Sequence, residues 1–359
     1  MSKLSSNRSF RDKLFSYAIV AVAYIAMQAM IGSGNITASL RGQLVPICAY
    51  AVMAISLNLT VGVLGELSLG HAGFMSIGAF TGVIASVSLE AIIPMVPVRL
   101  AVSMAVGAVS AGIAGVLIGI PVLRLRDDYL AIVTLAFGEI IKNLITCLYV
   151  GLDENGLHMS FLGSISDLNM AEGAKTIVNG PMGIAGIEKL STFTAGIVLI
   201  VISIFIVLNL IGSRAGRAIM AVRDNRIAAE SVGIPVTKYK LMAFVTSAVL
   251  AGAAGALYAM NYSTIVASKF NFNTSISILV FVVLGGLGNI WGSMVAATVL
   301  TILPELLREF NDYRMLVYAV VLVIVMLTTN NPAFNTFFGK IKDGISGLFI
   351  KGGKGGEAR

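Results

Sequence analysis

Long apolar segments, separated by short stretches rich in glycine, proline and charge, follow one another along the chain. About 20 apolar residues cross a bilayer as a helix. Because an unpaired backbone group cannot face lipid, each segment is predicted to be helical, or buried where its helix breaks. The nine segments are residues 14–31, 43–60, 67–89, 100–120, 129–150, 190–211, 241–262, 275–303 and 315–329.

The segment 275–303 differs from the others because glycines interrupt it. Gly285, Gly286 and Gly288, followed by Asn289, divide it into pieces of about 11 and 14 residues. A single crossing there would also place the basic C-terminal tail outside the cell, against the preference of Lys and Arg for the cytoplasmic side. We therefore expect two short broken helices with no net crossing.

Composition agrees with a chain that lies mostly in lipid. Hydrophobic residues make up 57% of the sequence and charged residues 12%, whereas a soluble domain has about 25% charged residues. The predicted class is an all-α polytopic membrane protein with about 8–10 transmembrane helices. The net charge of +7 comes from basic residues in loops and tails, where they set topology, so nucleic acid is not an expected partner.

Charge in the loops predicts the orientation and the domain limits. Four basic residues precede the first apolar segment, whereas the loop 151–189 has five acidic residues against two lysines. The positive-inside rule then places the basic loop 213–240 in the cytoplasm and the loop 151–189 outside. We expect a cytoplasmic N-terminal segment 1–13, a transmembrane domain 14–330 and a basic cytoplasmic tail 331–359.

The loop 213–240 is predicted to contain a short capped helix at residues 224–233. Asp224 or Asn225 can cap its N-terminus, Gly233 fits the position after its C-terminus, and Pro235 prevents continuation. A helix of two turns is marginal alone in water, so its small apolar face is expected to dock into a groove of another protein. That face consists of Ile227, Ala228, Ser231 and Val232.

A basic loop that only sets topology would explain the arginines of this segment but not its caps. We therefore predict that the segment couples the membrane domain to a partner. The candidate coupling residues are Arg217, Arg223, Asp224, Asn225, Ala228, Ala229, Glu230 and Gly233.

Glycine-containing breaks in both halves of the chain are the candidates for a translocation pathway or gate, because broken helices expose backbone groups that can line a polar route. Close helix packing through glycine is the alternative. A histidine satisfied by a neighbouring carbonyl is likewise the alternative for His71, which the topology places with Glu66 toward the cytoplasmic side. The pathway candidates are Ser68, Gly70, His71, Glu139, Gly286, Gly288 and Asn289.

Four ordered stretches are similar to the branched-chain amino-acid permease family of LivM type. They are residues 65–79, 123–139, 216–235 and 283–292, and within the third Ala228-Ala229-Glu230-Ser231-Val232-Gly233 resembles the coupling loop of ABC importer permeases. The resemblance extends over most of the chain and implies a type II importer fold with about ten helices. The expected location is a bacterial inner membrane, and the charge pattern described above places both termini in the cytoplasm.

The same resemblance implies partners. They are a second permease subunit (LivH-like, or a second copy of this chain), two cytoplasmic ABC ATPase subunits that carry ATP and Mg, and an extracytoplasmic substrate-binding protein. The sequence agrees with this division, because it contains no phosphate-binding motif of the form G-x-x-x-x-G-K-[ST]. No catalytic residues and no cofactor or metal are predicted for this chain itself.

Glu139 has two interpretations. Three residues before Lys142, it can form an ion pair on one helix face, or it can face the pathway and contact a substrate ammonium group. Prominent intramembrane carboxylates would indicate an alternative class, a secondary transporter or channel driven by an ion gradient, and Glu139 alone is deeply placed. An assembly protein without transport is a third class, which predicts no pathway.

Overall fold

A computed structural model of the chain describes residues 20, 24–33, 37–123, 127–153, 156–161 and 175–307, with single positions at 316, 319, 320 and 323. The predicted segments 1–13 and 331–359 lie outside the described residues, as does most of 315–329. Residues up to Ile302 form one unit and those from Leu303 a second. The description below concerns the first unit.

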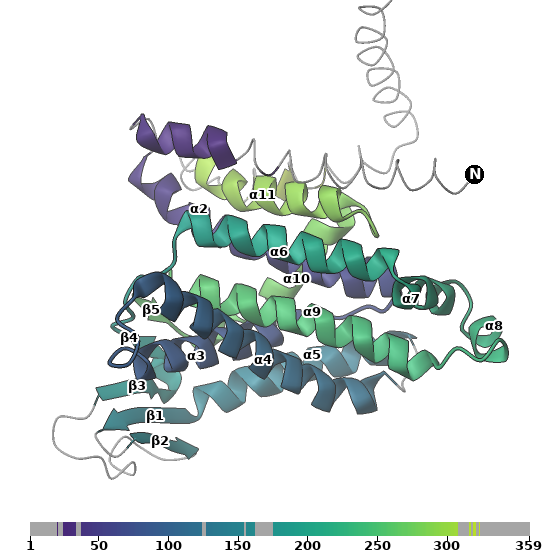
Figure 1. Cartoon of the computed structure of the whole chain (residues 1–359), viewed down its shortest axis with the longest axis horizontal. Coiled ribbons are helices and arrows are strands. Elements are labelled where there is room, and N and C mark those ends of the chain that lie inside the picture. The colour runs from purple at the N-terminus through teal and green to yellow at the C-terminus, as the bar shows by residue number, and fades with distance from the viewer. Residues whose placement is uncertain are drawn as a thin grey trace, which may run out of the picture. The chain divides into compact units, whose positions relative to one another are not determined.

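The chain is predominantly helical, which confirms the predicted class (Figure 1). Among the described residues, seven helices are long and apolar enough to cross a membrane, and α11 is a shorter apolar helix. The main helices are α2 (Ala38–Asn58), extended by the π-helix η1 (Leu59–Leu64), α3 (His71–Ser88), α4 (Val96–Val122), α5 (Asp127–Thr146), α6 (Phe193–Gly212), α9 (Val236–Ala259), α10 (Phe272–Gly285) and α11 (Ile290–Leu306).

Small residues hold the centre of the unit together. The most extensive contacts join α9 to α3 and α4, and a methyl group on Gly78 of α3 would overlap the backbone of Gly252 in α9. Gly82 of α3 packs in the same way against Ala256. Lipid is as apolar as leucine, so helices in a bilayer associate by close packing of this kind.

The predicted break in segment 275–303 is confirmed. Helix α10 ends at Gly285 and α11 begins at Ile290, with Gly286 and Gly288 between them in the positive-φ region (φ 92° and 81°). The two pieces have 14 and 17 residues, so both are longer than predicted. The extra residues lie outside the predicted limits, at Phe272 and Leu306, where neither Asn273 nor Pro304 stops the helix.

The two pieces run in opposite directions along α2. Tyr50 and Asn58 of α2 contact Phe281 and Gly288 respectively, so α10 is parallel to α2. Helix α11 runs antiparallel to α2. Its Ser293 accepts a hydrogen bond from Asn58, and its later residues line a cavity together with Leu44 and Cys48, which are earlier in α2. This hairpin is the arrangement expected of a segment with no net crossing.

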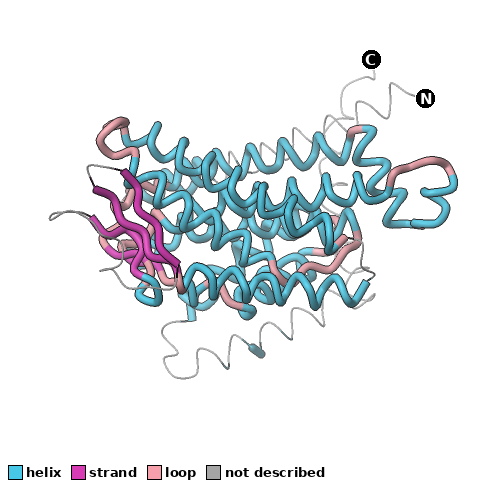
Figure 2. Tube along the Cα trace, turned by 90° about the horizontal axis from the view of Figure 1, so that it is seen from below, coloured by secondary structure: helices cyan, strands magenta, loops and turns pink. Residues whose placement is uncertain are grey.

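The loop 151–189 contains strands that were not predicted. Strands β1 (Leu148–Asp153), β2 (Gly156–Phe161) and β3 (Lys175–Asn179) form an antiparallel sheet in the order β2-β1-β3, and β4 (Ile184–Ala185) pairs with β5 (Thr264–Ile265). The strands gather at one end of the helices (Figure 2). Asn155-Gly156 is a hairpin turn signal that was present in the sequence.

The contact between Gly78 and Gly252 yields a prediction for stability. Replacing Gly78 with alanine forces α3 away from the backbone of α9, and we expect a loss of about 1–3 kcal/mol in the free energy of unfolding. Gly42→Ala is the matched control, because a methyl group at Gly42 of α2 meets nothing within 4 Å. Thermal unfolding in detergent, followed by Trp291 fluorescence, measures both; equal melting temperatures would contradict the packing account.

Candidate coupling and gating site

The loop 213–240 is built from two helices, not one. Helix α7 (Arg214–Asp224) precedes α8 (Arg226–Ser231), and α9 already begins at Val236. The short helix predicted between caps at 224 or 225 and 233 is α8, whereas α7 was not predicted. Ser213, whose Oγ accepts from the amide of Gly216 at 3.1 Å, was an available signal for the start of α7.

The predicted caps of the short helix are present. Asn225 is the N-cap of α8, its Oδ1 accepting from the Ala228 amide at 3.0 Å, whereas Asp224 ends α7 and pairs with Arg223. Gly233 takes φ 82°, and the amide of Ile234 donates to the Ala229 carbonyl. Caps at both ends stabilise a helix that six residues alone would not maintain.

Helix α8 has one buried position and an exposed apolar surface. Ala229 packs against Val222 of α7 and Val236 of α9. Ile227 and Val232 are 80% and 73% exposed, while Arg226 and Glu230 form an ion pair at 3.2 Å beside them. Helices α7 and α8 lie at the end of the unit opposite the strands (Figure 2). The exposed side chains are thus available to another protein.

Three side chains join this segment to the membrane helices. Arg223 donates from Nη1 to the Gly62 carbonyl of η1 at 3.1 Å. Glu66, two residues after the end of η1, forms an ion pair with Lys240 of α9, and both side chains are less than 10% exposed. These groups surround a cavity of about 420 Å³ whose lining includes Gly65, Asn225 and Arg226. The Arg217 side chain, by contrast, has a single hydrogen bond within the described part of the chain, to the Gly212 carbonyl at 3.4 Å.

The first break, between η1 and α3, is closely packed. Gly65 takes φ 82° and ends η1. A methyl group on Gly70 would overlap the Thr134 carbonyl of α5, and the Leu69 amide donates to Thr134 Oγ1 at 3.1 Å. Gly70 is thus closely packed against α5, as the packing alternative expects, and its place in the pathway stays a prediction. Ser68 is buried, and its Oγ has no hydrogen-bond partner among the residues that the structure describes.

His71 begins α3 and is satisfied by a side chain instead of a carbonyl. Its Nε2 lies 2.7 Å from Ser56 Oγ of α2, and its side chain is buried. Ser247 of α9 donates to the Ser56 carbonyl at 2.6 Å. His71 is thus part of a hydrogen-bonded connection across α2, α3 and α9.

The second break is held by residues on both sides of it. Asn289 is exposed and accepts from the Gly292 amide at 3.2 Å, so it caps α11. The Gly288 amide donates to Asn58 Oδ1 at 2.8 Å, and Asn58 Nδ2 donates to Ser293 Oγ at 2.7 Å. Asn58 was not among the predicted site residues, although a lone asparagine in an apolar segment was a usable signal.

Glu139 and Lys142 form the predicted ion pair on α5, and their side chains are 34% and 23% exposed. The predicted ion pair is therefore present, and a role of Glu139 in the pathway stays a prediction. Partial exposure leaves the carboxylate accessible from outside this chain.

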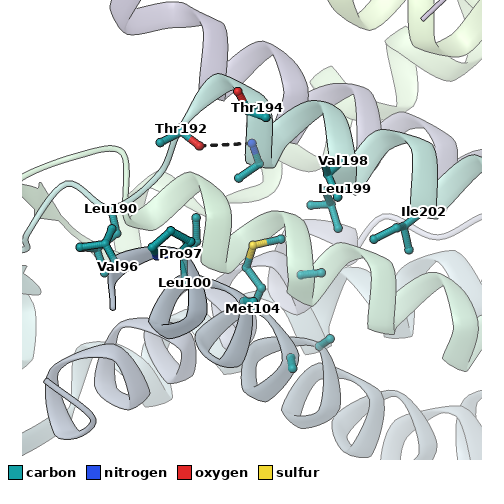
Figure 3. A pocket seen from close by; sticks show the side chains of 15 residues that line it. Val96, Pro97, Leu100, Met104, Leu190, Thr192, Thr194, Val198, Leu199 and Ile202 are labelled. Carbon is teal, nitrogen blue, oxygen red and sulfur yellow. Dashed lines mark hydrogen bonds between the residues drawn. The ribbon is translucent and has the colours of Figure 1, made fainter. Parts of the chain in front are cut away.

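A separate cavity of about 660 Å³ lies between α4 and α6 (Figure 3). Its walls are almost entirely apolar, with Leu100, Met104, Val198 and Ile202 among the lining residues and two threonines at one end. An amino acid has two charged groups, and burying them without partners is costly. This cavity is therefore not the polar route.

A multi-pass helical unit with two helix breaks, joined to a capped helix, is an architecture that fits a membrane transport subunit. A family model described as the permease component of branched-chain amino acid transport systems matches residues 39–326. The chain belongs to this family. As an ABC permease component it works with an ATPase and a substrate-binding protein.

Two similar relatives are high-affinity branched-chain amino acid transport system permease proteins named LivM. The protein from Salmonella typhimurium is 32% identical, the match covering 88% of this chain and 73% of the relative; that from Escherichia coli is 31% identical with the same coverage. The fructose import permease FruG of Bifidobacterium longum is 29% identical over 33% of this chain and 37% of its own. No solved structure matches the chain.

The buried pair of Glu66 and Lys240 yields a prediction. Glu66→Gln leaves the Lys240 ammonium buried without a counter-charge, and we expect a loss of about 3–5 kcal/mol in the free energy of unfolding. Glu90→Gln removes a carboxylate from an exposed pair with Lys175 and should cost less than about 1 kcal/mol.

The double variant Glu66→Gln/Lys240→Met removes both charges and should be more stable than Glu66→Gln alone. Thermal unfolding of the purified chain in detergent measures all three variants. If Glu66→Gln melts at the same temperature as Glu90→Gln, the pair does not hold α9 to the first break.

Proposed function

We propose that this chain is the permease subunit of an ATP-driven importer for branched-chain or other small amino acids, forming half of the translocation pathway. The observation that carries the proposal is α8, a capped helix with exposed apolar side chains beside it, joined to α9 through Ala229 and, through Arg223 of the preceding α7, to η1. A rigid attachment of this kind can transmit a displacement, because its ends are fixed on both sides.

In the proposed mechanism, the ATPase subunits bind α8. When the two ATPase subunits close on ATP, they move α7 and α8 together. The residues proposed for this coupling contact the ATPase directly or fix the ends of α8. They are Arg217, Arg223 to Asn225, Ala228 to Glu230 and Gly233. The pathway is opened and closed at the breaks, where Ser68, His71 and Gly288 lie. Glu139, on the exposed side of α5, is proposed to meet the ammonium group of the substrate.

The proposed substrate class rests on the family and on the LivM relatives, whose names specify branched-chain amino acids. Leucine, isoleucine and valine are therefore the first substrates to test. The binding protein, a separate chain, supplies most of the discrimination in this proposal.

The proposed assembly contains a second permease, LivH-like or a second copy, two cytoplasmic ABC ATPases that bind ATP and Mg, and an extracytoplasmic binding protein. The basic α7–α8 segment supports a cytoplasmic location for that end of the unit, and the acidic loop with strands β1–β3 supports an outer location for the other. Residence in a bacterial inner membrane, with both termini in the cytoplasm, is part of the proposal.

Reconstitution tests the proposed function directly. Proteoliposomes that contain the permeases and ATPases, with the binding protein and radiolabelled leucine on the outer side, should accumulate leucine only when ATP is inside. Isoleucine or valine in excess should compete. Accumulation that persists on an ion gradient without ATP would contradict the proposal and favour a secondary transporter.

The exposed apolar surface of α8 gives a second test. Ile227→Asn should weaken binding of the ATPase subunits by about 2 kcal/mol, roughly thirtyfold, as expected for a central contact residue. Ile92→Asn is the matched control, because Ile92 is 73% exposed but follows α3 at the end with the strands. Co-purification of the ATPases under stringent washing is the readout. Equal retention by both variants would exclude Ile227 from the interface.

A further inference from the structure

The π-helix η1 continues α2 to Leu64 and brings two residues against the second break. A π-helix is rare and is found frequently at functional sites, because its wider turn displaces side chains and carbonyls from their α-helical positions. Here Asn58 precedes η1 and Gly62 lies within it. Both face Gly288, which is 226 or more positions away in sequence.

The side-chain amide of Asn58 bonds to the α10–α11 hairpin through both its oxygen and its nitrogen. Its side chain is fully buried; Oδ1 accepts from the Gly288 amide at 2.8 Å, and Nδ2 donates to Ser293 Oγ at 2.7 Å. Gly288 has φ 81° and belongs to neither helix, so its amide has no partner in a helical ladder. The buried Asn58 side chain supplies a partner to this amide and so holds the break in the observed position.

Gly62 connects the hydrogen bond between Asn58 and Gly288 to the coupling segment, which consists of α7 and α8. A methyl group on Gly62 would overlap both Asn58 Oδ1 and the Gly288 amide, so the two backbones meet without side chains between them. The carbonyl of the same Gly62 accepts from Arg223 Nη1 at 3.1 Å. Contacts thus run without interruption from the end of α7, through one residue of η1, to the break.

We propose that Arg223 and Asn58 are positioning residues that transmit the movement of α7 and α8 to the α10–α11 break through Gly62. The inference rests on the proposed ATP-driven function. A movement of Arg223 displaces the Gly62 carbonyl to which it is bonded. Asn58, which precedes η1, then moves with it, and its hydrogen bond to the Gly288 amide shifts or breaks. Gly286 and Gly288 are then able to change conformation. The break is the two-state element that such coupling requires. The Glu66–Lys240 pair is the competing route, since it joins α9 to the first break instead.

The test is leucine uptake per ATP hydrolysed by the complete complex in proteoliposomes. Asn58→Ala and Arg223→Ala should each lower this ratio by about fivefold or more, the usual lower range of coupling between sites, while ATP hydrolysis continues. Arg223 is 40% exposed, so its variant leaves the buried core intact. Should Asn58→Ala fail to assemble, Ser293→Ala replaces it, because it removes one of the two amide contacts.

The double variant decides whether the two residues act in series. If they do, Asn58→Ala/Arg223→Ala has the ratio of the more affected single variant; independent roles would multiply the two losses. Two matched controls should retain the wild-type ratio. Thr60→Val removes a buried hydroxyl from η1 that has no partner within the described part of the chain, and Arg214→Ala removes the same charge from the first position of α7.

The outcomes separate the two proposals. Absence of ATP-dependent uptake by the wild-type complex overturns the proposed function. Normal wild-type uptake together with unchanged ratios in Asn58→Ala and Arg223→Ala, or with equal losses in the two controls, overturns this inference alone. Multiplying losses in the double variant also overturn it, because they place the residues on separate routes.

Discussion

A backbone amide that leaves a helix loses its partner in the helical ladder, and in a packed bundle another helix can supply a new one. This constraint governs both breaks of the chain. At the first, Thr134 of α5 and Ser275 of α10 accept from the amides of Leu69 and Ala72. At the second, Asn58 of α2 accepts from Gly288. Each break is therefore fixed by a helix distant in sequence.

The consequence is that the breaks are joints between helices. A displacement of either break changes hydrogen bonds to at least two helices or strands. A small movement of one element therefore also moves its neighbours. Helix α2 and its π-helical extension lie at the centre of this arrangement, since they contact His71 through Ser56, the second break through Asn58, and the coupling segment through Gly62. A permease driven from outside the membrane needs such a rigid connection.

The sequence predicted the features that depend on local chemistry. Glycines at 285–288 predicted the break, Asn225 and Gly233 predicted the ends of α8, and the spacing of Glu139 and Lys142 predicted their ion pair. Apolar length predicted the helices to within a few residues at most ends. The clearest local failures were α7, where arginines were taken for a loop, and strands β1–β3, where Asn155-Gly156 was overlooked.

Features that depend on distant partners were not accessible from one sequence. Gly70 was selected as a pathway residue because it lies in a break, but its close packing against the Thr134 carbonyl, 64 positions away, could not be predicted from the sequence. Lys240 lies 174 positions from Glu66 and Ser293 lies 235 from Asn58. Neither periodicity nor composition specifies which polar residues meet across a bundle, so the connection between coupling segment and break required the fold.

The most direct measurement of the central claim is amide hydrogen exchange of residues 285–293 in the complete complex, with the ATPases either free of nucleotide or trapped closed with ATP and vanadate. If the coupling segment controls the break, exchange of the Gly288 amide and its neighbours changes on trapping, although the nucleotide binds to other chains. Identical exchange in the two states, in a complex that imports leucine, would contradict the account.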